Sequence, residues 1–239
     1  MAIVGSARAW VSRTGPLLAA VLRTLRRSGG ATERPRQAVF TDIYHHNGWR
    51  GRESVSGTGS SLQQTERVRQ ELPKLLRALG VRSMLDAPCG DFHWMSRVPL
   101  CVDRYIGLDI VPELVEALRR QHGRLGREFI TGDLATDPLP EVDLIFSRDC
   151  LVHLPFQDIR VVLQNFKKSG SKLLLTTTFP AVLANRDVRM TGKWRPLNLQ
   201  LAPLSFPEPV RLINEGCTEM DGRFKDKSLG LWRLADLPG

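Results

Sequence analysis

Residues 82–179 alternate between short, nearly continuous apolar runs and longer runs in which apolar positions recur every three or four residues. The short runs are typical of buried strands and the longer runs of amphipathic helices. Strands are predicted at residues 82–86, 105–109, 128–131, 142–147 and 172–179, and the clearest helices at residues 112–121 and 156–168. Strands that alternate with helices indicate a largely parallel sheet with helices on its faces.

The flanking segments carry different patterns. Residues 39–61 are rich in Gly, Ser and aromatic side chains and are predicted to form a loop. A helix is expected to start at Ser61, which has capping-box spacing to Gln64, and to end at Gly80 after a kink at Pro73. Residues 180–209 contain five prolines and no sustained helical period, so we expect an excursion over the sheet.

Two further apolar runs, at residues 210–214 and 229–234, predict a pair of strands that is antiparallel at one edge of the sheet. The expected architecture is an α/β fold, with a doubly wound, mostly parallel, seven-stranded sheet and an antiparallel terminal strand. The chain has 239 residues and 42% apolar content, which suits one sizeable core. We therefore expect a single domain at residues 39–239, preceded by a basic leader at residues 1–38.

The net charge of +9 is distributed unevenly. Residues 1–36 contain seven arginines and one glutamate, whereas the rest of the chain contains 27 basic and 24 acidic side chains. That balance is an ordinary surface and disfavours a nucleic-acid partner. The four cysteines form neither a CxxC pair nor a cluster with zinc-ligand spacing, so neither a metal site nor a disulfide framework is predicted, and a reducing compartment is expected.

The leader contains one apolar run, residues 16–22, which is too short to span a bilayer and is followed by arginines where a secretory cleavage site needs small residues. No transmembrane segment is predicted. Three interpretations remain open: an organelle-targeting presequence within residues 1–36, an amphipathic helix that associates weakly with a surface, or a poorly ordered tail. A cytoplasmic location is expected unless the leader directs the chain elsewhere.

Three carboxylates stand at or just beyond the ends of three consecutive predicted strands: Asp86, Asp109 and Asp133. In an open parallel sheet, ligands bind outside the carboxyl ends of the strands, so these acids are expected to line one crevice. Their separations of 23 and 24 residues suit one crossover unit each. A single acid at such a junction is also typical of a helix cap or a turn, whereas three in register favour a binding site.

With these residues the sequence resembles the class I S-adenosylmethionine-dependent methyltransferases, in which the first strand ends in an acid followed by a glycine turn. The resemblance covers about residues 60–179 and the terminal strand pair. It implies that Asp86 and Gly90 hold the methionine part of the cofactor S-adenosyl-L-methionine. It also implies that Asp109, with the adjacent Ile110, contacts the ribose, and that Asp133 and Leu134 contact the adenine.

The turn departs from the family pattern, because Pro88 and Phe92 stand where the first and third glycines are common and only Gly90 remains. Asp91 is expected to compensate by pairing with the methionine ammonium group. The loop at residues 54–60, rich in Ser, Thr and Gly, either folds over the cofactor or is a flexible turn.

The fourth strand ends in a segment that, in this family, flanks the reacting methyl group. Asp149 and His153 are therefore the candidates for contacting the acceptor, with Asp149 orienting or deprotonating a hydroxyl and Arg148 beside it to neutralise its charge. A lone histidine such as His153 is more often a structural residue, and that interpretation stays open beside the functional one.

The predicted function is methyl transfer from S-adenosyl-L-methionine to a hydroxyl of a polar small molecule or glycan, with residues 180–209 on the acceptor side. The mixture of aromatic and hydrogen-bonding side chains in that segment motivates the acceptor class. Two alternatives remain: a cofactor-binding interaction module without catalysis, motivated by the depleted glycine turn, and an NAD-dependent oxidoreductase, which the missing GxGxxG argues against.

Overall fold

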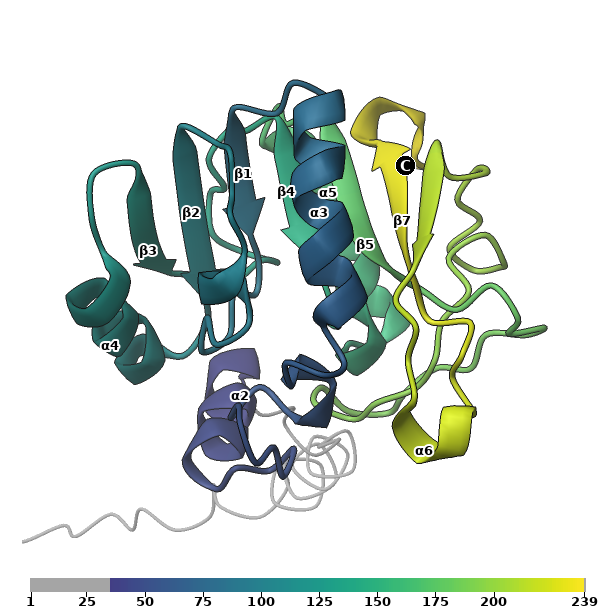
Figure 1. The fold of residues 1–239 in the computed structure, drawn as a ribbon. Helices are drawn as coiled ribbons and strands as arrows, with labels where there is room; N and C mark the ends of the chain where they lie inside the picture. The colour runs from purple at the N-terminus through teal and green to yellow at the C-terminus, as the bar shows by residue number, and fades with distance from the viewer. Residues whose placement is uncertain (1–34, 239) are drawn as a thin grey trace, which may run out of the picture. The chain divides into compact units, whose positions relative to one another are not determined.

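The computed structural model describes residues 35–238, and the predicted leader lies outside this range except for its last four residues. Seven strands form one sheet in the order β3-β2-β1-β4-β5-β7-β6 (Figure 1). The strands are β1 Ser83–Asp86, β2 Arg104–Asp109, β3 Arg127–Thr131, β4 Leu144–Ser147, β5 Leu173–Thr178, β6 Arg211–Asn214 and β7 Ser228–Arg233. The first five are parallel, and β7 is antiparallel to both β5 and β6, so the predicted fold class is confirmed.

The helices cover both faces of this sheet. Helices α3 (Glu66–Ala78) and α4 (Pro112–His122) contribute buried leucines and valines to one core cluster, whereas α5 (Phe156–Lys168) contributes to the other. The central strands serve both cores, because successive side chains of a strand point to opposite faces: Met84 belongs to the first cluster and Leu85 to the second. This two-sided burial explains the nearly continuous apolar runs of the strands.

The excursion at residues 180–209 packs back on the face covered by α5. Leu197, Leu199, Leu204 and Phe206 are buried in the second core cluster. The amide of Asn185 donates to the backbone carbonyls of Asn198, Leu201 and Ala202 and so holds the segment together without regular secondary structure. The polar side chains of this segment therefore serve partly to satisfy its own backbone.

Two local predictions were wrong. Residues 39–61 were expected to be loop throughout, but α2 (Arg36–His45) occupies their first part and crosses the boundary expected at residue 38. Every glycine of that block follows His46, while Phe40, Ile43 and Tyr44 have helical spacing.

The helix expected at Ser61 begins at Glu66 instead. The predicted capping hydrogen bond from the N–H of Gln64 to Ser61 Oγ is present at 3.2 Å, but it closes a turn before the helix. No helix within residues 35–238 is long and apolar enough to cross a membrane.

Candidate active site

A cavity with about 1170 Å³ of empty volume opens at the carboxyl ends of the parallel strands. It is lined by all seven residues predicted to contact the cofactor, Asp86, Gly90, Asp91, Asp109, Ile110, Asp133 and Leu134, and by both predicted acceptor contacts, Asp149 and His153. The parallel register brings these residues together, because the ends of β1, β2, β3 and β4 meet at one edge of the sheet.

Asp109 ends β2 and is almost fully buried. Its two carboxylate oxygens accept backbone N–H groups from Gly90 at 3.0 Å and Val111 at 3.1 Å, which joins the turn after β1 to the end of β2. Burial raises the pKa of Asp109 to about 6, although these hydrogen bonds oppose the rise. A carboxylate has further lone pairs, so this side chain can still accept hydroxyl groups from a ligand.

Asp86 ends β1 and is buried more deeply than Asp109, with 3% of its surface exposed against 6%. Burial raises its pKa to about 7, against the opposing effect of the Tyr105 hydroxyl, which donates to Asp86 Oδ2 at 2.5 Å. The nearby carboxylate of Asp109 raises the pKa further. A carboxyl group with a pKa near neutrality is ready to lose its proton when a cation is placed beside it.

The turn after β1 requires glycine at residue 90. Gly90 has φ +55°, and a Cβ at this position would lie 2.2 Å from the hydroxyl oxygen of Ser56. Ser56 belongs to the loop at residues 54–60, which thus lies directly against the turn. Gly90 is thus the position where the backbone of the turn after β1 lies close to the loop at residues 54–60.

The carboxylate of Asp91 holds this loop in place through hydrogen bonds. Its carboxylate accepts hydrogen bonds from the hydroxyl of Ser54 and the N–H of Val55, both at 2.9 Å, and from the N–H of His93 at 3.2 Å. Val55, Ser56 and Ser60 line the cavity as a result. The loop at residues 54–60 therefore forms part of the cavity wall, and its folding over the cofactor stays a prediction.

The carboxylate of Asp133 is paired with Arg36, a residue that the sequence did not single out as functional. The guanidinium of Arg36 on α2 binds its carboxylate at 3.0 Å and also lies 3.3 Å from Asp158 on α5. Arg36, Phe40 and Tyr44 line the cavity. Helix α2 thus forms part of the cavity wall next to the predicted adenine position.

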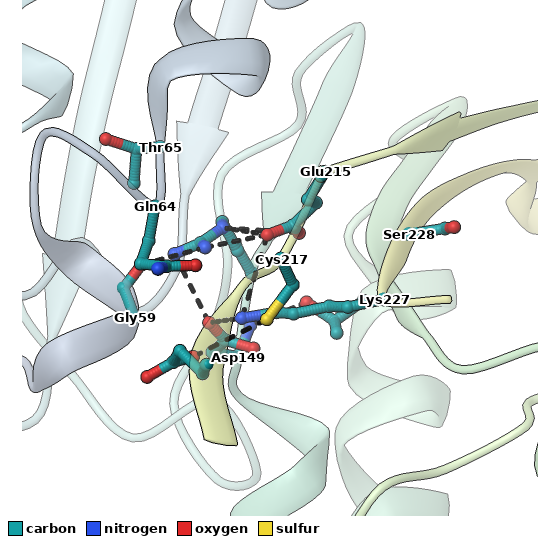
Figure 2. A network of polar contacts seen from close by, with 12 residues as sticks. Gly59, Gln64, Thr65, Asp149, Glu215, Cys217, Lys227 and Ser228 are labelled. Carbon is teal, nitrogen blue, oxygen red and sulfur yellow. Dashed lines mark hydrogen bonds and ion pairs between the residues drawn. The ribbon is translucent and has the colours of Figure 1, made fainter. Parts of the chain in front are cut away.

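Beyond β4, the buried side chains of Arg148, Glu215 and Lys227 form a charge cluster with Asp149, whose side chain is 24% exposed; Figure 2 labels Asp149, Glu215 and Lys227. Arg148 lies 2.7 Å from Glu215 and 3.2 Å from Asp149, and Lys227 lies 2.6 Å from Asp149 and 3.6 Å from Glu215. Arg148 also donates to the carbonyl oxygen of Gly59 at 2.9 Å. The cluster therefore ties the end of β4 to the loop at residues 54–60 and to the strand pair β6 and β7.

This cluster fixes the protonation state of Asp149. Burial alone would raise its pKa, but the positive charges of Lys227 and Arg148 outweigh burial and lower the pKa to about 2. The residue adopts φ +53°, a strained conformation for a residue other than glycine, and its N–H donates to Thr177 Oγ1. Its second oxygen, Oδ1, is buried without a hydrogen-bond partner among residues 35–238.

His153 presents a second unpartnered atom. Its Nδ1 is buried and has no hydrogen-bond partner in the described part of the chain. Burial lowers its pKa to about 4, although the Asp149 carboxylate opposes the decrease. The imidazole ring packs on the indole of Trp49 with ring centroids 5.0 Å apart. It is therefore neutral near pH 7 and can accept a hydrogen bond or a proton.

A second cavity, with about 810 Å³ of empty volume, adjoins the first. The two share Trp49, Ser56, Asp149 and His153. Within residues 35–238, no group of three or more His, Cys, Asp or Glu side chains is placed to hold a metal ion.

Sequence reasoning missed Lys227 and Glu215, although the strand directions carried a signal for them. Because β7 runs antiparallel to β5, its first residue, Ser228, pairs with Thr178 at the end of β5. Asn214 at the end of β6 pairs with the same Ser228. Residues 215 and 227 must therefore lie at the edge of the sheet where the parallel strands end.

Comparisons with known proteins agree with this geometry. Residues 84–169 match the model of a methyltransferase domain family. The methyltransferase domain of bacterial CtHen1 is similar in structure, with a TM-score of 0.51 and 14% identity over 72% of this chain and 98% of that chain. No curated protein matches the sequence.

Two further similar structures carry the cofactor or its product. Magnesium protoporphyrin IX methyltransferase from Synechocystis PCC 6803 with bound S-adenosylhomocysteine has a TM-score of 0.47 at 18% identity, covering 62% of this chain and 74% of that chain. Human N-acetylserotonin methyltransferase in complex with S-adenosylmethionine has a TM-score of 0.46 at 17% identity, covering 92% and 67%. The family match decides between the predicted cofactors in favour of S-adenosyl-L-methionine. Residues 84–169 thus belong to a methyltransferase domain family, and the strand order and the cavity at the sheet edge agree with the predicted resemblance to the class I S-adenosylmethionine-dependent methyltransferases.

Proposed function

We propose that this methyltransferase acts on a hydroxyl group of a polar small molecule or glycan, with Asp149 and His153 as the residues that contact the acceptor. The observation that carries the proposal is that both residues line the cofactor cavity and the second cavity, and so stand where the two spaces meet. A hydroxyl bound in the second cavity would approach the cofactor past these two side chains.

The residues of the first cavity fit the cofactor. Asp109 offers carboxylate oxygens to the ribose hydroxyls, and Gly90 keeps the turn clear of the ligand and of Ser56. Asp86, whose pKa is about 7, suits the neighbourhood of the methionine ammonium group. When bound, the cofactor supplies a methyl group on a positively charged sulfur, and the S–CH₃ bond breaks with its electron pair left on sulfur as the O–CH₃ bond forms.

Asp149 is suited to orient the acceptor rather than to remove its proton. With a pKa of about 2 it stays ionised, and its unpartnered Oδ1 can accept the hydrogen of a hydroxyl group. That hydrogen bond fixes the direction in which an oxygen lone pair points. Positioning of this kind supplies a large part of the rate enhancement in a displacement reaction.

His153 is suited to take the proton. Its Nδ1 is free and the ring is neutral near pH 7, because its pKa is about 4. A base this weak is sufficient, since an oxygen that has gained a methyl group while still protonated is strongly acidic.

The test compares cofactor binding with turnover in the same variants. Asp149→Asn is expected to bind S-adenosyl-L-methionine like the unaltered protein and to lower kcat by about tenfold or more, because the amide is a weaker acceptor. His153→Gln should lower kcat without weakening cofactor binding. Normal turnover of both variants with any methylated acceptor would contradict these roles, and purified protein that binds the cofactor without transferring methyl would support the non-catalytic alternative.

A further inference from the structure

The second cavity is walled by aromatic side chains from three distant segments. Trp194 from the excursion, Phe179 after β5 and Phe224 before β7 pack edge to face, with centroid separations of 5.9 Å for Phe179 and Trp194 and 4.8 Å for Trp194 and Phe224. Trp49 joins them at the boundary with the cofactor cavity. Trp194 remains 42% exposed, so a ligand in this cavity can pack on apolar ring surface.

Two residues that line this cavity carry a buried hydrogen-bond acceptor without a partner in the described part of the chain. Asp149 Oδ1 and His153 Nδ1 have no partner among residues 35–238. The only ammonium group lining the cavity in this part of the chain, that of Lys227, is engaged by Asp149 Oδ2 at 2.6 Å. The hydroxyl of Thr58 donates to Glu219 at 2.5 Å. A ligand that satisfies these two acceptor atoms therefore has to bring hydrogen-bond donors.

The charges around the cavity nearly cancel. Arg148 and Lys227 balance Asp149 and Glu215, and Glu219 is left as the additional charge. Of these groups only Asp149, Glu219 and Lys227 line the cavity, so an anionic ligand meets two carboxylates and one ammonium group that Asp149 already engages. The surroundings therefore disfavour an anionic ligand, whereas a neutral ligand adds no charge beside the paired groups.

We propose that the second cavity binds the saturated ring of a neutral sugar, with its C–H face on Trp194 and Phe224 and one ring hydroxyl donating to Asp149 Oδ1. A pyranose ring has apolar C–H faces and hydroxyl donors on its rim, which matches aromatic walls beside acceptor atoms that have no hydrogen-bond partner within residues 35–238. The inference rests on the proposed function, since it names the acceptor of the same site. As the sugar oxygen gains the methyl group and the S–CH₃ bond breaks, the proton that this oxygen had shared with Asp149 Oδ1 is released and is taken up by the neutral ring of His153 at Nδ1.

The experiment uses the full chain with three groups of probes: methyl glycosides of common hexoses, simple phenols and primary alkylamines. Saturation-transfer NMR in the presence of S-adenosylhomocysteine reads binding, and release of S-adenosylhomocysteine from S-adenosyl-L-methionine reads transfer. We expect saturation of the ring C–H protons of at least one hexoside and its methylation. Trp194→Ala should lower kcat/KM for that sugar about tenfold while leaving the Kd of the cofactor unchanged.

Two further variants make the result specific. Trp194→Phe retains an aromatic face and should restore part of the loss. Leu183→Ala, at a 92% exposed position of the same excursion that does not line the cavity, should change neither parameter. Phe224→Leu provides a second test of the wall should Trp194→Ala fail to fold.

The outcomes separate the two proposals. Protein that does not bind S-adenosyl-L-methionine contradicts the proposed function itself. Protein that binds the cofactor but methylates only phenols keeps the proposed hydroxyl acceptor and overturns the sugar, whereas methylation of amines alone overturns the hydroxyl acceptor as well. The sugar is also overturned if no hexoside shows saturation transfer. Sugar turnover that is equally fast in Trp194→Ala and Phe224→Leu overturns the placement of the ring.

Discussion

The buried charge cluster beside the second cavity gives a sharp prediction for Arg148→Met. The Arg148 side chain is 4% exposed and that of Glu215 is 1% exposed, and the guanidinium donates to both carboxylate oxygens, with a shortest contact of 2.7 Å. Removing one partner of a buried pair leaves an uncompensated charge and costs about 3–5 kcal/mol. Lys227 remains 3.6 Å from Glu215, so we expect the lower end, about 3 kcal/mol.

The double variant Arg148→Met with Glu215→Met distinguishes this explanation from a simple loss of packing. It removes both charges and leaves the Lys227 and Asp149 pair neutral as a whole. Its cost should be smaller than that of Arg148→Met alone, because no buried charge is left without a partner. The assay is urea unfolding of the protein without cofactor at neutral pH, with the slope of each transition compared between variants.

An exposed ion pair supplies the matched control. Arg104 and Glu128 lie 2.8 Å apart, but each side chain is 50% exposed. Arg104→Met should therefore cost less than about 1 kcal/mol. The reasoning is refuted if Arg148→Met costs no more than this control, or if the double variant costs the sum of its two single changes.

Three further changes test the geometry of the first cavity. Burial favours the protonated form of Asp86, with a pKa of about 7, so the free energy of unfolding should fall as pH rises from about 4 to about 7, and Asp86→Asn should remove about 4 kcal/mol of that fall in urea titrations. An unchanged pH profile would contradict this. Gly90→Ala should weaken cofactor binding in calorimetry, because the new Cβ would lie 2.2 Å from the hydroxyl oxygen of Ser56. Adding Ser56→Gly should restore part of the binding, and failure of this rescue would show that the contact with Ser56 is not the cause. Arg36→Ala should speed amide exchange in α2, because the bond to Asp133 is lost, while global stability changes by less than about 1 kcal/mol.

The sheet could be predicted from the sequence because its strands are buried on both faces, so their apolar runs stand out from the helices between them. The antiparallel pair at the edge was predicted as well, and it carries part of the site. Helix α2 was missed because it is short and none of its residues is fully buried. Its interactions come from tertiary contacts such as that between Arg36 and Asp133, which are 97 residues apart.

The residues that were predicted from their position at a strand end line the cavity, whereas the side chains that pair with them were not predicted. Lys227 meets Asp149 across 78 residues, and Glu215 meets Arg148 across 67. No local pattern marks such a pair, because each member alone is typical of a solvated charge. The excursion shows the converse: of its polar side chains that suggested a ligand, Asn185 and Asn198 hold the segment's own backbone, and Trp194 lines the second cavity.

Calorimetric titration of the full chain with S-adenosyl-L-methionine tests the central claim most directly, with Asp109→Ala as the site variant and the exposed Asp236→Ala as the control. The account predicts micromolar binding of S-adenosyl-L-methionine and S-adenosylhomocysteine, none of NADH, loss of binding in Asp109→Ala and normal binding in Asp236→Ala. Well-folded protein that does not bind S-adenosyl-L-methionine, or an Asp109→Ala variant that binds it normally, would contradict the account.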